Sequence, residues 1–210
     1  TLRIVDHDLV DESNTSTGRT CYGRHDIGKY KVLALKEKIQ GLYPDTRVIA
    51  LCRNVHDVSQ SELRYWAQMS QAALVAIDEG PALVRLNRAL YSYLPVFYRG
   101  LHHQGLSGQI IVTRPGLPCL ACCLGLRSGQ EIQTLHHEPA LGIFFSTLAQ
   151  ITAQLVIQEL ACRTFPNVEA PLGPEVSVLF ISNIVSPLTP QGTALIPFRC
   201  VQRDPGCPLC

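Results

Sequence analysis

The chain has 210 residues, 46% of them hydrophobic, which is enough to bury one sizeable core and is typical of a single domain. Its net charge of +1, from 18 Lys and Arg against 17 Asp and Glu, gives no electrostatic reason to expect nucleic acid or an anionic membrane as a partner. Nine cysteines, an odd number, suit a reducing compartment better than a secreted disulfide framework, and we therefore expect a cytoplasmic protein.

Short apolar runs alternate with helix-like stretches from the start of the chain, which is typical of a mostly parallel sheet with covering helices. We expect strands at 2–5, 47–51 and 72–77, and helices at 27–42, 61–69 and 81–93. Asp26 is placed to cap the first of these helices, whose apolar residues recur at helical spacing. The third strand is apolar throughout, which predicts that it is buried.

The second part of the chain predicts one long helix among shorter strands. We expect the helix at 140–162, strands at 95–98, 109–113, 177–181, 194–197 and 198–202, and loops at 124–139 and 166–174. Polar residues interrupt the apolar stretch at 141–160 too often for a membrane-spanning helix. We therefore expect no membrane partner, and we also expect no signal peptide.

Two Cys-x-x-Cys pairs are the strongest chemical signal in the sequence: Cys119 with Cys122, and Cys207 with Cys210. Four thiolates in two short knuckles complete one tetrahedral zinc shell, and a closed four-sulfur site is structural. Such a site would clamp the C-terminal segment back onto the middle of the chain. Two disulfides, or thiols that hold no metal, are the alternatives. The other cysteines, including Cys123 next to the first pair, are expected to be buried structural thiols.

Two aspartates follow predicted strands, and ligands bind beyond the carboxyl ends of strands in open α/β sheets. Asp6 follows the first strand, where an acid commonly holds ribose hydroxyls, and Asp78 follows the third, where a carboxylate suits magnesium. Arg19, Lys29 and Lys31 lie in or just after a loop rich in Ser, Thr, Asn and Gly and suit phosphate oxygens. The alternatives are turn residues or helix caps for the acids and solvated side chains for the lysines.

Three segments carry a family resemblance. The first runs Asp6-His-Asp-Leu-Val-Asp-Glu-Ser-Asn14, then Gly18-Arg19, then Asp26-Ile-Gly-Lys-Tyr-Lys31; the others are 108–122 with the first cysteine pair and 204–210 with the second. Together they resemble the signature of the ThiF/MoeB/HesA superfamily, the ubiquitin-activating-enzyme-like adenylating enzymes. The resemblance implies one domain over 1–210, with a Rossmann-like, mostly parallel sheet, covering helices, C-terminal antiparallel strands and a zinc knuckle pair.

The resemblance also implies an activity and assigns roles to residues. Asp6 becomes the ribose ligand, Asn14, Arg19 and Lys31 surround the phosphates of ATP, and Asp78 holds magnesium. The reaction is attack of a C-terminal carboxylate on the α-phosphate of ATP, which gives an acyl adenylate and pyrophosphate. Arg19, Lys31 and Asp78 would act catalytically, by positioning and charge neutralisation. The typical substrate is a ubiquitin-like or sulfur-carrier protein, less often a small peptide.

The sequence departs from the family pattern at its start. The glycine-rich phosphate loop belongs to a strand and helix that would precede residue 2, so we expect an N-terminally truncated domain that is inactive alone. A homodimer or a preceding domain would complete the sheet. Arg19 comes two positions later than the usual spacing, and Arg85 is a displaced substitute for the arginine expected after Asp78. The alternative function is a catalytically silent scaffold that docks a ubiquitin-like partner.

Overall fold

The computed structural model describes residues 1–15, 21–102, 106–126, 142–169, 172, 176–182, 194–199 and 203–207. The chain divides into two compact units, Thr1–Ser59 with Leu141–Ile143, and Gln60–Ala140 with Phe144–Cys210. Two of the predicted site residues, Arg19 and Cys210, lie outside the described residues. The single domain over 1–210 stays a prediction.

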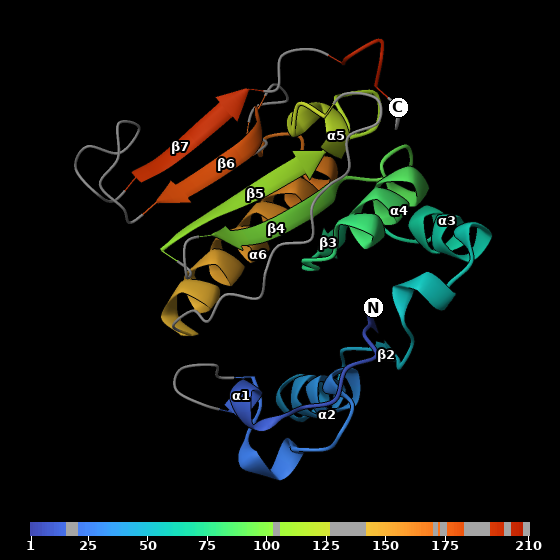
Figure 1. The fold of residues 1–210 in the computed structure, drawn as a ribbon, viewed down its shortest axis with the longest axis vertical. Helices are drawn as coiled ribbons and strands as arrows, with labels where there is room; N and C mark the ends of the chain where they lie inside the picture. The colour runs from blue at the N-terminus through green and yellow to red at the C-terminus, as the bar shows by residue number, and fades with distance from the viewer. Residues whose placement is uncertain are drawn as a thin grey trace. The chain divides into compact units, whose positions relative to one another are not determined.

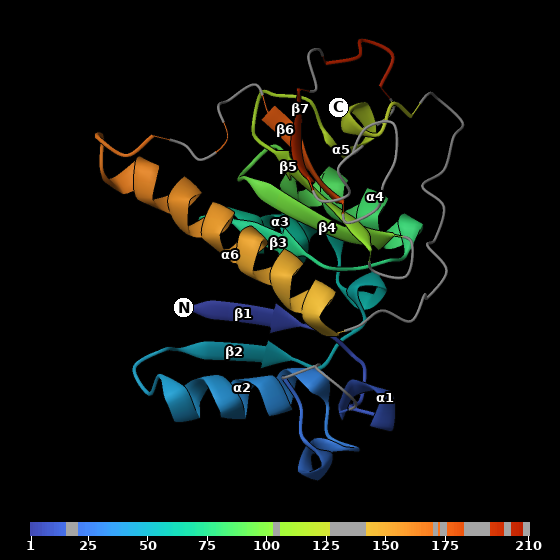
Figure 2. The same ribbon diagram turned by 90° about the vertical axis from the view of Figure 1, so that its left-hand side faces the viewer.

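The first unit is a pair of parallel strands with a helix along it. Strand β1 (Leu2–Val5) pairs with β2 (Val48–Leu51), and the register runs from Leu2↔Val48 to Val5↔Leu51. Helix α2 (Lys31–Leu42) lies beside this pair, as Figure 2 shows. The shorter elements are α1 (Glu12–Thr15) and the 3₁₀ turns η1 (Arg24–Asp26) and η2 (Val55–Asp57).

Helix α2 begins four residues later than the sequence predicts, and Asp26 is not its cap. Tyr30 occupies the N-cap position, and it is held there by an antiparallel bridge to Leu9. Gly28 has a φ of 86°, which breaks the helical path between Asp26 and Tyr30. Asp26 instead ends η1, where its carboxylate accepts a hydrogen bond from the Gly23 backbone N–H at 2.9 Å.

The second unit is built on a five-stranded sheet in the order β3-β4-β5-β6-β7 (Figure 1). Its strands are β3 (Ala73–Val75), β4 (Val96–His102), β5 (Ser107–Thr113), β6 (Val176–Ser182) and β7 (Ala194–Arg199). Strands β3 and β4 pair in parallel, and the later pairs are antiparallel. The helices are α3 (Gln60–Gln68), α4 (Gly80–Leu90), α5 (Leu120–Cys123) and α6 (Gly142–Thr164). The predicted α/β class with C-terminal antiparallel strands is confirmed.

Two strand predictions need correction. Strand β3 has three residues rather than six, and Leu74 in it is 49% exposed, because β3 is at one end of the sheet order and pairs with β4 alone among the described strands. The expected strands 194–197 and 198–202 are one strand up to Arg199, and residues 200–202 lie outside the described part. Pro197 does not break β7, because β7 pairs with β6 alone among the described strands and an edge strand tolerates a residue without an N–H.

Helix α6 lies across one face of this sheet (Figures 1 and 2) and closes the main core. The buried cluster between them consists of Phe97, Ile110, Val112, Leu148, Leu155 and Leu179. Gly108 permits the close packing, since a Cβ there would meet Gly100 O at 3.1 Å and Leu148 Cδ2 at 3.2 Å. Within the described residues, no helix has the length and apolarity needed to cross a bilayer.

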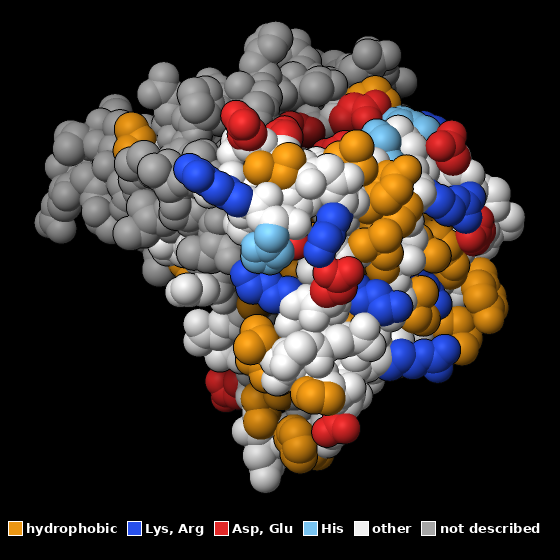
Figure 3. All heavy atoms as spheres, turned by 90° about the horizontal axis from the view of Figure 1, so that it is seen from below, with side chains coloured by type: hydrophobic (Ala, Val, Ile, Leu, Met, Phe, Trp, Pro, Cys, Tyr) orange, Lys and Arg blue, Asp and Glu red, His pale blue; other side chains and the backbone are white. Residues whose placement is uncertain are grey.

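A buried ion pair ties α6 to the end of β5. Glu159 Oε2 accepts hydrogen bonds from Arg114 Nε at 3.2 Å and from Arg114 Nη2 at 3.0 Å. Arg163 Nη2 lies 3.5 Å from the other carboxylate oxygen of Glu159. Figure 3 shows acidic and basic side chains side by side on one face of the described residues.

Candidate functional site

The carboxyl ends of β1 and β2 bring two loops together in the first unit. Asp6 follows β1 directly, and its backbone N–H donates to Leu51 O at 3.2 Å, at the last residue of β2. Because the strands are parallel, the residues that follow them meet at one edge. There Asn54 Nδ2 lies 3.4 Å from His7 Nε2. Asp6 therefore lies at the carboxyl ends of β1 and β2, and its role as a ribose ligand stays a prediction.

Asp8 connects Asp6 to Lys31. The Asp8 backbone N–H donates to Asp6 Oδ1 at 2.8 Å, and Lys31 Nζ donates to Asp8 Oδ2 at 2.7 Å. The Lys31 backbone N–H also donates to Asp8 O at 2.9 Å, so Asp8 fixes the start of α2 as well as the ammonium group. The Lys31 and Asp8 side chains are 22% and 50% exposed, so the pair is accessible to a ligand.

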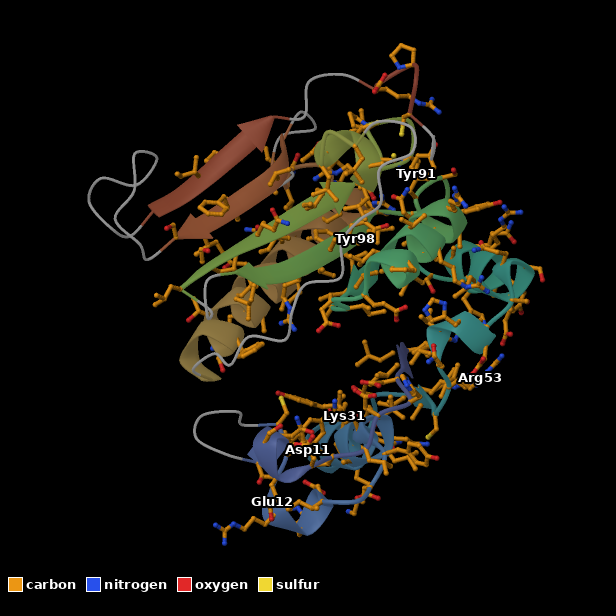
Figure 4. All side chains as sticks on the ribbon, in the orientation of Figure 1. Asp11, Glu12, Lys31, Arg53, Tyr91 and Tyr98 are labelled. Atoms are coloured by element: carbon orange, nitrogen blue, oxygen red, sulfur yellow. The ribbon has the colours of Figure 1, made fainter. Side chains whose placement is uncertain are left out.

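Asn14 is held in the short helix α1 by a reciprocal pair of hydrogen bonds. Its Oδ1 accepts from the Asp11 backbone N–H at 3.0 Å, and Asp11 Oδ1 accepts from the Asn14 N–H at 3.1 Å. The Ser13 hydroxyl donates to the same Asp11 oxygen at 2.6 Å and is the main cause that lowers the pKa of Asp11. Asp11 and Lys31 lie in the same part of the first unit in Figure 4.

Lys29 has a different environment from Lys31. Its ammonium donates to Glu37 Oε2 at 2.8 Å and to Asp26 Oδ1 at 3.3 Å. The hydrogen bond to Glu37 is the main cause that raises the pKa of Lys29. Two carboxylates thus hold Lys29, whereas one exposed carboxylate holds Lys31, and Lys31 is the better candidate for a phosphate contact.

Asp78 belongs to the second unit, whereas Asp6, Asn14 and Lys31 belong to the first. Asp78 is exposed and lies in the segment between β3 and α4. The nucleotide site as one assembly of these four residues stays a prediction. Arg85, the suggested substitute for a missing arginine, lies on α4 with a buried Nε, and its carbonyl accepts from Gln60 Nε2 at 3.3 Å.

Three of the four predicted zinc ligands lie together in the second unit. The Sγ atoms of Cys119, Cys122 and Cys207 are all within 4.8 Å of one another. Cys119 Sγ lies 3.9 Å from Cys122 Sγ and 3.5 Å from Cys207 Sγ. Zinc–sulfur bonds of about 2.3 Å in a tetrahedron place sulfur atoms about 3.8 Å apart, so the spacing fits zinc. A disulfide needs about 2.05 Å, so the disulfide alternative is wrong for the described cysteines.

A short helix and a tight turn bring the three thiols together. Cys119 is the N-cap of α5, and the Cys123 N–H donates to Cys119 O at 3.0 Å, which closes one helical turn between the first two thiols. Cys207 ends a tight turn in which its N–H donates to Asp204 O at 3.0 Å. Tyr91, labelled in Figure 4, packs against the cluster, in which Cys119 and Cys207 are buried.

The remaining cysteines follow the prediction only in part, and Cys200 lies outside the described residues. Cys123 and Cys162 are partly buried, but Cys21 and Cys52 are exposed, so the expectation of buried structural thiols is wrong for those two. The position of each residue in the fold explains why the two side chains are exposed. Cys21 lies in a surface turn, and Cys52 follows Leu51, the last residue of β2.

Sequence reasoning missed two residues that hold others in place. Asp8 had a usable signal, since it stands two positions after Asp6 at the same strand end. Asn87 had a weaker one: a polar residue among the apolar positions of a helix, buried with 0% exposure. Its Oδ1 accepts hydrogen bonds from the Leu120 backbone N–H at 3.1 Å and from the Tyr98 hydroxyl at 3.3 Å.

Comparison with known proteins gives a family match and a set of similar folds. The model of the ThiF family matches residues 1–174. A search of the curated proteins gave no match. The crystal structure of E. coli MccB with ATP has a TM-score of 0.73 and 15% identity, over 99% of this chain and 58% of that chain.

Two further structures extend the comparison. The microcin C7 biosynthetic enzyme MccB in complex with N-formylated MccA has a TM-score of 0.73 and 17% identity, over 99% of this chain and 59% of that one. Selenomethionine PaaA has a TM-score of 0.61 and 16% identity, over 93% of this chain and 63% of that one. These likenesses show a Rossmann-like α/β fold. The chain spans 58% of the length of the MccB chain solved with ATP.

Proposed function

The chain belongs to the ThiF family, whose model matches residues 1–174, and from this membership we propose that it takes part in the ATP-dependent adenylation of a C-terminal carboxylate. The carboxylate belongs to a ubiquitin-like or sulfur-carrier protein. The fold shared with MccB, solved with ATP and in complex with N-formylated MccA, supports ATP as the nucleotide. The observation that carries the proposal is the chain of contacts from Asp6 through Asp8 to Lys31, where α/β sheets bind nucleotides.

The proposed reaction needs positioning and charge neutralisation rather than a general base, because a C-terminal carboxylate is ionised at neutral pH. One carboxylate oxygen bonds to the α-phosphorus, the bond from that phosphorus to the bridging oxygen breaks, and pyrophosphate leaves with the electron pair. Negative charge grows on phosphate oxygens in this step, so fixed cations and N–H donors lower the barrier.

Each predicted site residue of the first unit has a defined role in the proposed reaction. Asp6 accepts a ribose hydroxyl hydrogen bond with the oxygen that Asp8 does not use. Asn14 donates from Nδ2, because its Oδ1 already accepts from Asp11. Lys31 donates to a phosphate oxygen, and Arg19 adds a second positive charge.

Lys31 can change partners at low cost. Partly exposed ion pairs such as Lys31 with Asp8 stabilise proteins by about 0.2–1 kcal/mol. A triphosphate carries several negative charges and accepts stronger charge-assisted hydrogen bonds than one exposed carboxylate. We therefore propose that Asp8 holds the ammonium in place until ATP arrives.

Asp78 is our proposed magnesium ligand. Magnesium takes one or two protein carboxylates together with phosphate oxygens and water, and an exposed aspartate beyond a strand end fits that requirement. Bound there, the ion would neutralise charge on the phosphates of ATP.

The test is ATP–pyrophosphate exchange by the natural protein that contains this chain, with candidate carrier tails. We expect Asp78→Ala and Lys31→Ala to lower exchange by about 10²–10³-fold, as the loss of one transition-state contact does. The matched controls are Asp45→Ala, in an exposed turn, and Lys29→Ala, whose ammonium is already held by Asp26 and Glu37. Unchanged exchange in Lys31→Ala would contradict the site, and carrier binding without any exchange would favour the silent scaffold.

We further propose that Cys119, Cys122, Cys207 and Cys210 hold one structural zinc ion. The three described thiols support this, since their 3.5 and 3.9 Å spacings suit a tetrahedral shell. Metal analysis should find one zinc per chain. Cys119→Ser should lose it, whereas the neighbouring Cys123→Ser should keep it, and equal zinc content in the two variants would exclude this ligand set.

The assembly and the location of the protein complete the proposal. We propose that either a second copy of the protein or a preceding domain of the same polypeptide completes the sheet. Sedimentation of the natural protein distinguishes the two, because a homodimer has twice the mass of one polypeptide. We also propose a reducing compartment, the cytoplasm, because no disulfide joins any of the described cysteines.

A further inference from the structure

Asn87 joins three elements around the thiol cluster of Cys119, Cys122 and Cys207. It lies on α4 with 0% exposure. Its Oδ1 accepts one hydrogen bond from the Tyr98 hydroxyl of β4 at 3.3 Å and one from the Leu120 backbone N–H of α5 at 3.1 Å. One amide oxygen thus links α4 to the sheet and to the turn between the first two cysteines.

The bond to Leu120 satisfies a specific need of α5. The first N–H groups of a helix have no acceptor within the helix, and a residue at the N-cap normally supplies one through its side chain. Cys119 occupies the N-cap of α5 and makes no such side-chain bond. Asn87, which is 33 positions earlier in the chain, supplies an acceptor for the first of these N–H groups, that of Leu120. A remote side chain therefore fixes the backbone directly after Cys119.

The burial of Asn87 carries an energetic cost that calls for a compensating role. Its Nδ2 is buried and has no hydrogen-bond partner among the described residues. A buried amide donor without a partner costs about 1–3 kcal/mol, and an apolar side chain of similar size would avoid that cost. Packing alone would favour leucine at this position, so the two bonds to Oδ1 are the feature that requires asparagine.

We propose that Asn87 is a positioning residue for the zinc site, and this inference rests on the zinc site proposed above. Asn87 is not a ligand. It acts through the Leu120 N–H, which sets the turn of α5 so that the sulfurs of Cys119 and Cys122 keep the 3.9 Å spacing of a tetrahedral shell. Groups that orient metal ligands in this way affect how firmly the metal is held.

The test measures zinc release from the natural, zinc-loaded protein to a colorimetric chelator. We expect Asn87→Ala to release zinc about 10–100-fold faster than wild type, the usual effect of losing a group that orients ligands. Tyr98→Phe removes the other donor to the same oxygen but leaves the Leu120 bond, so its release rate should stay close to wild type. Thr152→Ala removes a buried hydrogen bond to Leu148 O in α6, in the same unit, and controls for general destabilisation.

The absorption spectrum of the cobalt-substituted protein adds a measurement that a loss of stability alone would not change. The cobalt-loaded Asn87→Ala variant should show altered d–d bands, because the geometry of the thiolates changes, while Thr152→Ala should match wild type. Equal zinc release and equal spectra in Asn87→Ala and Thr152→Ala would overturn the inference. Absence of zinc from the wild-type protein would instead refute the zinc site, and the inference would fall with it.

A measurement on the wild-type protein covers the case in which Asn87→Ala does not fold. The Leu120 amide hydrogen should be protected from solvent exchange if Asn87 Oδ1 holds it. Protection of Leu120 that disappears when zinc is removed supports the coupling of this bond to the metal. Rapid exchange of Leu120 in the zinc-loaded protein would refute the proposed role of Asn87.

Discussion

Replacing the buried Glu159 of α6 by leucine should strongly destabilise the second unit. The Glu159 side chain is 6% exposed, and that of its main partner, Arg114, is 12% exposed. Two hydrogen bonds join Arg114 to one carboxylate oxygen, at 3.0 and 3.2 Å. Glu159→Leu removes both of these hydrogen bonds and the carboxylate that faces the buried Arg114 guanidinium.

The expected loss follows from these two contacts. A hydrogen bond to a charged group contributes about 1.5–3 kcal/mol, and breaking a buried ion pair by removing one partner costs about 3–5 kcal/mol. We therefore expect Glu159→Leu to lower the free energy of unfolding by about 3–5 kcal/mol, a large share of the total stability of a domain. Arg163 lies 3.5 Å from Glu159 with its side chain 45% exposed, so Arg163→Ala should cost less than about 1 kcal/mol.

Urea unfolding followed by circular dichroism measures both effects through the midpoint at an unchanged slope. The double variant Arg114→Leu with Glu159→Leu should recover much of the loss, because a well-packed apolar pair replaces a buried ion pair at little cost. Similar midpoints for Glu159→Leu and Arg163→Ala would refute the reasoning, since burial of Arg114 would then carry no penalty.

Three further predictions concern pH and glycine. The pKa of Asp26 lies below 3.8, chiefly because the Gly23 N–H donates to it, so its contribution is present above that pH and lost as the pH falls; Asp26→Asn should flatten the acid branch of melting temperature against pH. Burial raises the pKa of Tyr98 well above 10.0, so its contribution is present below pH 10.0 and lost as the pH rises; Tyr98→Phe should flatten the alkaline branch. Gly108→Ala should lower the melting temperature, at a cost of about 1–3 kcal/mol, because the new Cβ meets Gly100 O at 3.1 Å. In Gly41→Ala the new Cβ on α2 meets nothing within 4 Å, so this variant should be more stable by about 0.5–1 kcal/mol and should have a higher melting temperature. A higher melting temperature for Gly108→Ala than for Gly41→Ala would contradict the contact argument.

Features that depend on neighbouring residues were predictable from the sequence. Strand β1 was predicted at its observed bounds, and the helix predicted at 81–93 is α4, observed at Gly80–Leu90. The Cys-x-x-Cys spacing within each pair is a local signal of metal ligands, and Cys119, Cys122 and Cys207 do gather as it predicted.

Features that depend on distant contacts were not predictable. The start of α2 is set by the bridge from Leu9 to Tyr30, which helical periodicity does not encode. Lys31 was predicted to face phosphate, but its partner Asp8 is 23 positions away. Arg114 and Glu159 are 45 positions apart, and neither carries a motif. Such pairs become evident only when the strands and helices that hold them are placed together.

The distance along the chain between the thiols has a consequence for biosynthesis. Cys207 follows Cys119 by 88 residues. At about 5–20 residues per second, the ribosome needs about 4–18 s to synthesise that interval. Throughout it, Cys119 and Cys122 are thiols without their later partner, able to be oxidised or to bind a metal incompletely. The zinc ion proposed above can therefore be enclosed only after Cys207 has been synthesised, and production of the protein should depend on reducing conditions until then.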